Sequence, residues 1–180
     1  MSIRVEAITQ RNFDDLPGFR LHPYSCKYCV YWESTGDLDD RVEKSEAEKI
    51  KREWFRKVFS GFGNSGLLLY LDDVVIGYTQ FAPARLFPRL KEYAAPISLS
   101  NSVFLACLYL PRRELRGRGL GKLLLDSMTR NPKSRNYYTL ATLAKKQEES
   151  SELGPIGFYL KQGFKVVMQK ADYSMMVKEL

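Results

Sequence analysis

The sequence has few of the residues that build metal centres or disulfide frameworks: its 180 residues include one histidine and three cysteines. An odd cysteine count argues against the paired disulfides of small secreted proteins. No apolar run approaches the roughly 20 residues that a membrane-spanning helix needs. The first residues, MSIRVEAITQ, lack the apolar core of a signal peptide. These absences predict a cytoplasmic protein without a membrane partner.

The composition is that of an ordinary globular protein, with 44% hydrophobic and 27% charged residues. The length predicts one domain over residues 1–180, large enough for its own core. A net charge of +7 suits an anionic ligand or an acidic partner. The basic residues are spread along the chain, which does not favour nucleic acid as a partner. An RNA-associated protein stays a third hypothesis, which steeply salt-dependent RNA binding would support.

The densest basic group lies in residues 102–130, SVFLACLYLPRRELRGRGLGKLLLDSMTR. The pattern predicts a buried strand, a short loop with three glycines and an amphipathic helix. Such a loop favours an anion, because the first N–H groups of a helix lack intrahelical partners and the helix dipole is positive there. A simple turn would explain the glycines but not the charge, which is set by one acidic residue, Glu114, and five basic ones: Arg112, Arg113, Arg116, Arg118 and Lys122.

The spacing of the glycines distinguishes three phosphate-binding loops. A P-loop, G-x-x-x-x-G-K-[ST], would need glycine at Arg116 and a hydroxyl at Leu123. A dinucleotide loop, G-x-G-x-x-G, would need glycine at Lys122. The pattern R/Q-x-x-G-x-G/A is matched at every position by RGRGLG, residues 116–121.

A second motif lies about 40 residues downstream, GFYLKQGF at residues 157–164, with the pattern F-Y-x-x-x-G-F. Together the two motifs, in this order, resemble those of the GNAT N-acetyltransferase superfamily, and the order of predicted elements is similar along essentially the whole chain. The resemblance implies an α/β (α+β) fold in which a mixed, mostly antiparallel central sheet is flanked by helices on both faces. Alternation of strands and helices predicts a sandwich of the same class.

The resemblance also implies a reaction, in which acetyl-CoA gives its acetyl group to a primary amine by direct attack. In the family, the central strand's backbone holds the thioester and pantetheine, and the glycine loop holds the pyrophosphate. A tyrosine that corresponds to Tyr159 protonates the CoA thiolate, although Tyr159 could instead be a packing aromatic. The implied acetyl-CoA contacts are Leu108, Tyr109, Leu110, Arg116, Gly117, Arg118, Gly119, Leu120, Gly121 and Lys122.

A general base is harder to assign. The one histidine, His22, is far from both motifs in the sequence. Glu33 is a candidate because the segment after the first strand borders the acceptor cleft in the family, but a structural carboxylate is the alternative; ordered water could also serve. Many members carry asparagine seven residues before the tyrosine, where this chain has Glu152, so that pantetheine contact does not carry over.

Residues 19–37 form an insertion rich in aromatic residues, with Cys26 and Cys29 in a C-x-x-C pair. A zinc site would need these two residues together with Cys107 and His22, so no metal is predicted. The pair does not open a helix after a strand, as thioredoxin-type redox pairs do. We expect two small buried residues in an aromatic cluster.

Four other segments complete the interpretation. We expect a helix over residues 40–59, a hairpin over 66–81, a connection over 82–100 that runs on the surface, and a strand pair near the C-terminus. Family acceptor pockets use the segments that correspond to 19–37 and 82–101. The C-terminal strands would offer an edge at which a homodimer could pair. The alternative function is a non-catalytic acyl-CoA-binding or interaction module.

Overall fold

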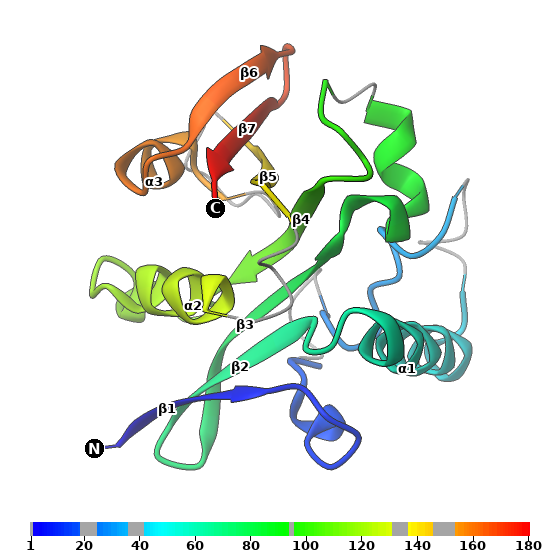
Figure 1. Ribbon diagram of the computed structural model, residues 1–180. Helices are drawn as coiled ribbons and strands as arrows, with labels where there is room; N and C mark the ends of the chain where they lie inside the picture. The colour runs from blue at the N-terminus through cyan, green and yellow to red at the C-terminus, as the bar shows by residue number, and fades with distance from the viewer. Residues whose placement is uncertain (1, 19–24, 36–41, 94–95, 131–136, 146–153) are drawn as a thin grey trace.

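The computed structural model describes residues 2–18, 25–35, 42–93, 96–130, 137–145 and 154–180. Within these ranges seven strands form one sheet in the order β1-β2-β3-β4-β5-β7-β6 (Figure 1). The strands are β1 (Ile3–Ala7), β2 (Gly66–Leu71), β3 (Val74–Pro83), β4 (Ser102–Tyr109), β5 (Thr139–Ala144), β6 (Lys165–Gln169) and β7 (Ser174–Glu179). The α-helices are α1 (Lys44–Gly61), α2 (Leu120–Thr129) and α3 (Ile156–Lys161); the 3-10 helices are η1 (Phe13–Asp15), η2 (Ala84–Leu86), η3 (Pro88–Tyr93) and η4 (Arg113–Leu115).

The sheet is mixed and mostly antiparallel, as expected. Neighbouring strands pair antiparallel except β4 and β5, which are parallel. A parallel neighbour needs a crossover connection, and α2 lies in the crossover between β4 and β5. The start of α2 is therefore close to the end of β4, at the middle of the sheet.

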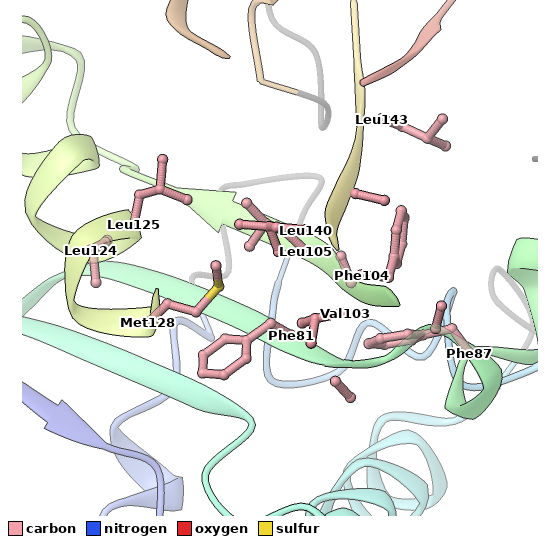
Figure 2. Packing of buried hydrophobic residues seen from close by; sticks show 14 of the residues in the cluster. Phe81, Phe87, Val103, Phe104, Leu105, Leu124, Leu125, Met128, Leu140 and Leu143 are labelled. Carbon is pink, nitrogen blue, oxygen red and sulfur yellow. The ribbon is translucent and has the colours of Figure 1, made fainter. Parts of the chain in front are cut away.

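Helices α1 and α2 cover opposite faces of the sheet (Figure 1). Along β2, Leu67 and Leu69 share a cluster with the apolar residues of α2, whereas Leu68 and Tyr70 share one with Phe55 of α1. This alternation follows from the two-residue period of a strand. Figure 2 shows the first cluster, with Met128 of α2 beside Phe81 of β3.

The connection over residues 82–100 differs from the prediction. Its described part is not a surface segment, because Phe87 and Leu90 are fully buried. The Phe87 ring packs between Trp54 of α1, at 5.2 Å, and Phe104 of β4, at 5.5 Å. The prolines do interrupt regular structure, but the apolar residues between them form part of the core.

The insertion also differs in part. Cys26 is buried as expected, but Cys29 is exposed. The Cys29 thiol nevertheless has protein atoms around it, and loss of solvation raises its pKa to about 11. Trp32 is buried against Phe104 at a ring distance of 4.8 Å. The insertion is thus held to the central strand by an aromatic contact.

None of the described helices is both long and apolar enough to cross a membrane. No group of three or more histidine, cysteine or acidic residues in the described ranges is arranged to hold a metal ion. His22 and Glu152 lie outside those ranges.

Candidate active site

The central strands β4 and β5 separate part-way along their length. Their pairing runs from Ser102 with Thr139 to Leu105 with Thr142 and then stops. At the same point β4 changes from buried to half-buried, beginning at Cys107. The last residues of β4 therefore present one backbone edge that β5 does not cover. We call this opening the fork.

The backbone of Leu108 points into the fork. The carbonyl of Cys107 turns towards β3, where it accepts a hydrogen bond from Thr79 Oγ1 at 2.8 Å. Peptide groups along a strand alternate between its two edges. Three backbone groups therefore face the β5 side: the N–H and C=O of Leu108 and the N–H of Leu110. They can form hydrogen bonds with an extended ligand that carries amide groups and a carbonyl.

Arg116 closes the far end of this edge. Its guanidinium donates two hydrogen bonds to the carbonyl oxygen of Leu110, from Nε at 3.2 Å and Nη2 at 3.0 Å. The side chain of Arg116, a residue of the expected acetyl-CoA loop, is thus tied to the end of the strand. This contact fixes the glycine loop relative to β4, and it engages the Leu110 carbonyl.

The loop glycines are required by backbone conformation. Gly117 and Gly119 have φ of +74° and +80°, in the left-handed region that favours glycine. A Cβ at either position would meet nothing within 4 Å, so space does not restrict the residue. The backbone of the loop is thus open to a ligand from outside.

The N-terminus of α2 is left uncapped by side chains, with Gly119 as its N-cap. The first bond into the helix is Leu123 N–H to Gly119 O, at 2.9 Å. The N–H groups of Leu120, Gly121 and Lys122 precede it and have no acceptor within the helix. They point out of the positive end of the helix dipole, and so form a site for an anion.

The charges around this helix end favour the same ligand. Arg112, Arg113 and Arg118 are exposed. Lys122 Nζ lies 2.6 Å from Asp126 Oδ2, but both side chains are open to solvent. Such an exposed ion pair contributes less than about 1 kcal/mol to stability. A phosphate could therefore take the place of Asp126 as the partner of Lys122.

Tyr159 lies buried on α3, next to the fork. Its ring packs edge-on against Phe158 and Phe164. The Thr142 hydroxyl and the Cys107 thiol both influence the protonation of its hydroxyl. Burial raises the pKa of this phenol above its ordinary value near 10, and interaction with the Thr142 hydroxyl opposes the shift. Tyr159 is therefore a neutral phenol, a possible proton donor at the fork.

The sequence analysis missed Gly154, which restricts the place of the Tyr159 ring, and Thr142, which lies at the last pair before the fork. A Cβ on Gly154 would lie 2.9 Å from Cε2 and from the hydroxyl of Tyr159, so the ring fits only against glycine. Thr142 donates to the Leu105 carbonyl at 2.9 Å, at the last β4–β5 pair. The signal for Thr142 was present: it is the one hydroxyl inside the apolar run LATLA, residues 140–144.

Glu33 is part of a buried polar network. Its Oε1 lies 2.5 Å from Lys51 Nζ and 2.6 Å from Gln80 Nε2. Gln80 Oε1 accepts from Lys51 at 2.9 Å and from the Tyr78 hydroxyl at 2.7 Å. The side chains of Glu33 and Lys51 are only 1% and 2% exposed. These contacts favour the structural carboxylate over the general base.

The two segments expected near the acceptor contact each other. Tyr31 and Tyr93 share a hydrogen bond between their hydroxyls, 2.5 Å apart. Trp32 packs on Tyr93, and so does Tyr173, which lies between β6 and β7. Because Trp32 also touches Phe104, this aromatic group lies against β4.

A sequence model described as the Acetyltransferase (GNAT) family matches residues 28–164. The chain belongs to the GNAT acetyltransferase family. The match includes both motifs, the fork and α3, and it shows that the protein is an enzyme, an acetyltransferase. No curated protein matches the sequence significantly.

Solved structures show the same fold at low identity. The PaiA N-acetyltransferase of Thermoplasma acidophilum, in complex with coenzyme A, is 20% identical, with full coverage of both chains and a TM-score of 0.62. YncA, a putative acetyltransferase from Salmonella typhimurium with acetyl-CoA, is 18% identical over 100% of this acetyltransferase and 95% of YncA, with a TM-score of 0.63. Ard1 of Thermoplasma volcanium is 11% identical, with 100% and 99% coverage and a TM-score of 0.59.

Proposed function

We propose that this acetyltransferase moves an acetyl group from acetyl-CoA to a primary amine by direct attack of the amine. One observation carries the proposal: the open backbone edge of β4 lies beside the uncapped N-terminus of α2, since Leu110 Cδ1 is 4.0 Å from where a Cβ on Gly121 would be. The first can hold the amides of a pantetheine arm, and the second can hold a pyrophosphate. The coenzyme A and acetyl-CoA bound to the similar proteins have both of these chemical features.

The proposed reaction uses groups on both sides of the fork. The neutral amine attacks the thioester carbon, and the Leu108 N–H stabilises the negative charge that develops on the carbonyl oxygen. The C–S bond then breaks, and the CoA thiolate takes the phenolic proton of Tyr159. The surplus proton of the amine nitrogen then passes through water to the phenolate, which restores the phenol. This sequence needs no carboxylate base, in agreement with the buried ion pair of Glu33.

We further propose that the acceptor approaches from the face that α1 covers. Leu110 lies on the face that α2 covers. Its Cδ2 and the Cδ1 of Leu124 in α2 both lie over Gly77, within 3.2 Å of where a Cβ on that glycine would be. The aromatic group of Tyr31, Trp32 and Tyr93 contacts β4 through Phe104, whose side chain points to the other face from its neighbours Val103 and Leu105. Aromatic rings attract cations, which suits an amine that arrives protonated.

The experiment is a turnover screen with acetyl-CoA and a mixed library of primary amines, read by release of free thiol. The proposal predicts thiol release that depends on the amine and a product whose mass increases by one acetyl group. Binding of acetyl-CoA without thiol release from any amine would instead indicate a non-catalytic binding module.

A further inference from the structure

A cavity of about 570 Å³ lies between α1 and the segment that leads from the end of β1 into η1. None of the residues that line it belongs to the fork or to the glycine loop. Helix α1 covers the face of the sheet opposite α2 (Figure 1), so the cavity lies away from the proposed pyrophosphate site. Its volume is that of a pocket for a small molecule.

The floor of the cavity is apolar and closely packed. The buried rings of Phe13 and Phe55 meet edge to face, with their centroids 6.1 Å apart. Ile8 and Phe55 come together over Gly66, where a Cβ would lie 2.5 Å from Ile8 Cδ1 and 2.9 Å from Phe55 Cε1. Phe59 also lines the cavity but is 62% exposed, so the apolar lining extends to the surface. This lining favours a ligand with an apolar ring or chain.

The wall opposite α1 is held in place by Asn12. Its Oδ1 accepts a hydrogen bond from the backbone N–H of Thr9 at 2.7 Å, and its Nδ2 donates to the carbonyl of Ala7 at 3.0 Å. Thr9 and Gln10 line the cavity from this loop. The wall is therefore formed before any ligand binds, which reduces the entropy cost of binding.

Two arginines line the cavity, one turn apart on α1. Arg52 is already engaged: its guanidinium lies 4.0 Å from the Phe13 ring centroid and bonds to Asp14 at 2.6 Å and to Glu48 at 2.8 Å. Arg56 is exposed and has no ion pair or hydrogen bond within the described ranges. It is thus the cation of the lining that can take a new partner.

The charges of the lining favour a carboxylate over a phosphate. A guanidinium binds a carboxylate through two parallel hydrogen bonds. Glu53 lies one turn before Arg56, also lines the cavity and is exposed. Because like charges repel, its carboxylate disfavours an anion with two negative charges more than an anion with one.

We propose that this cavity is a second binding site of the acetyltransferase, for a small molecule that joins an apolar ring or chain to a single carboxylate. The apolar part lies against Phe13, Phe55 and Phe59, and the carboxylate pairs with Arg56. This site goes beyond the proposed function and does not depend on it, because it shares no residue with the acetyl-CoA site.

The probe is 4-phenylbutyrate, titrated into the whole chain and followed by two-dimensional amide NMR, with and without saturating coenzyme A. We expect saturable shifts at residues 8–13 and 52–59, with a dissociation constant of about 1 mM or lower. Coenzyme A should leave these shifts unchanged. The neutral 4-phenylbutyramide, which keeps the ring, should bind at least about threefold more weakly, because it lacks the charge that Arg56 attracts.

Four substitutions at exposed positions of α1 locate the contacts, with melting temperatures to confirm that each variant folds. Arg56→Gln should weaken binding by about threefold or more, and Glu53→Gln should strengthen it by about twofold. Phe59→Ala should weaken binding through the lost apolar contact. Lys57→Gln is the matched control, since Lys57 is the next residue along the helix but does not line the cavity.

Several outcomes would overturn the proposal while leaving the proposed function intact. One is an absence of saturable shifts at residues 8–13 and 52–59. A second is a set of shifts confined to residues 108–122 that coenzyme A abolishes, which would place the carboxylate at the N-terminus of α2. Equal affinity for the carboxylate and the amide, or equal effects of Arg56→Gln and Lys57→Gln, would also contradict it.

Discussion

Replacement of Lys51 by methionine should destabilise the acetyltransferase strongly. Lys51 is the cation of a buried pair with Glu33, at 2.5 Å, and both side chains are almost fully enclosed. Removal of one partner leaves a buried charge without compensation, which costs about 3–5 kcal/mol. The free energy of unfolding of such a domain is about 5–15 kcal/mol, so urea denaturation should detect the loss easily.

The paired replacement decides whether the pair is structural. In Lys51→Met with Glu33→Leu, both charges are removed, and apolar replacement of a whole buried pair is often close to neutral. We expect this double variant to regain most of the stability lost in Lys51→Met. Gln80 loses two of its partners in the double variant, so recovery should be incomplete by about 1–2 kcal/mol.

The same double variant tests the role of Glu33 in catalysis. If Glu33 is structural, kcat should remain within about fivefold of wild type once stability is restored, because no proton passes through the pair. A general base contributes about 10²–10⁴-fold. A stable double variant with kcat lowered by a hundredfold or more would refute the reasoning and return Glu33 to the catalytic group.

The pH dependence of the pair follows from the shift on Lys51. Burial opposes its charged form, but the charge and hydrogen bond of Glu33, together with the nearby thiols of Cys26 and Cys29, outweigh burial and raise the pKa of Lys51 above its ordinary value. A group whose pKa is raised on folding stabilises the protein below its unfolded pKa and loses that contribution as pH rises through the folded pKa. The stability difference between wild type and Lys51→Met should therefore be constant near neutral pH and shrink above about pH 10.5.

Three further substitutions test the site. Gly119→Ala places a side chain on a residue with φ of +80°, at a cost of about 1–2 kcal/mol. This variant should bind acetyl-CoA more weakly, as measured by calorimetry. Gly157→Ala is the control: the position is helical, a Cβ there would meet nothing within 4 Å, and the affinity should be unchanged. Tyr159→Phe should lower kcat and leave the acetyl-CoA dissociation constant nearly unchanged; equal turnover would reject the acid. Gly154→Ala should push the Tyr159 ring and lower kcat in the same way, and a wild-type rate would show that the ring position is not critical.

The elements that the sequence predicted well are those with a strong local pattern. Two β-rich runs around an acidic turn in residues 66–81 indicated the β2–β3 hairpin, and RGRGLG indicated a glycine loop before a helix. The insertion and the connection over 82–100 were harder, because their elements are short and their fold depends on distant partners. Phe87 is buried only because Trp54 and Phe104 stand on either side of it, and nothing near it in the sequence shows that.

The candidate site, too, was predicted from the sequence only in part. The backbone groups of β4 and α2 could be inferred from motifs, since backbone chemistry follows from the type and order of elements. The partners of individual side chains could not. Glu33 and Lys51 are 18 residues apart, and Arg116 reaches back to Leu110 instead of outward. Thr142 acquires its position only when β5 pairs with β4.

The central claim is that the fork and the N-terminus of α2 form one acetyl-CoA site. Calorimetric titration with acetyl-CoA and with S-acetyl-pantetheine, which lacks the pyrophosphate, tests it most directly. The account predicts clear binding of acetyl-CoA, binding of acetyl-pantetheine at least about tenfold weaker, and a smaller difference between them in Gly119→Ala. Absence of acetyl-CoA binding at millimolar concentration, or equal affinity for both compounds, would contradict it.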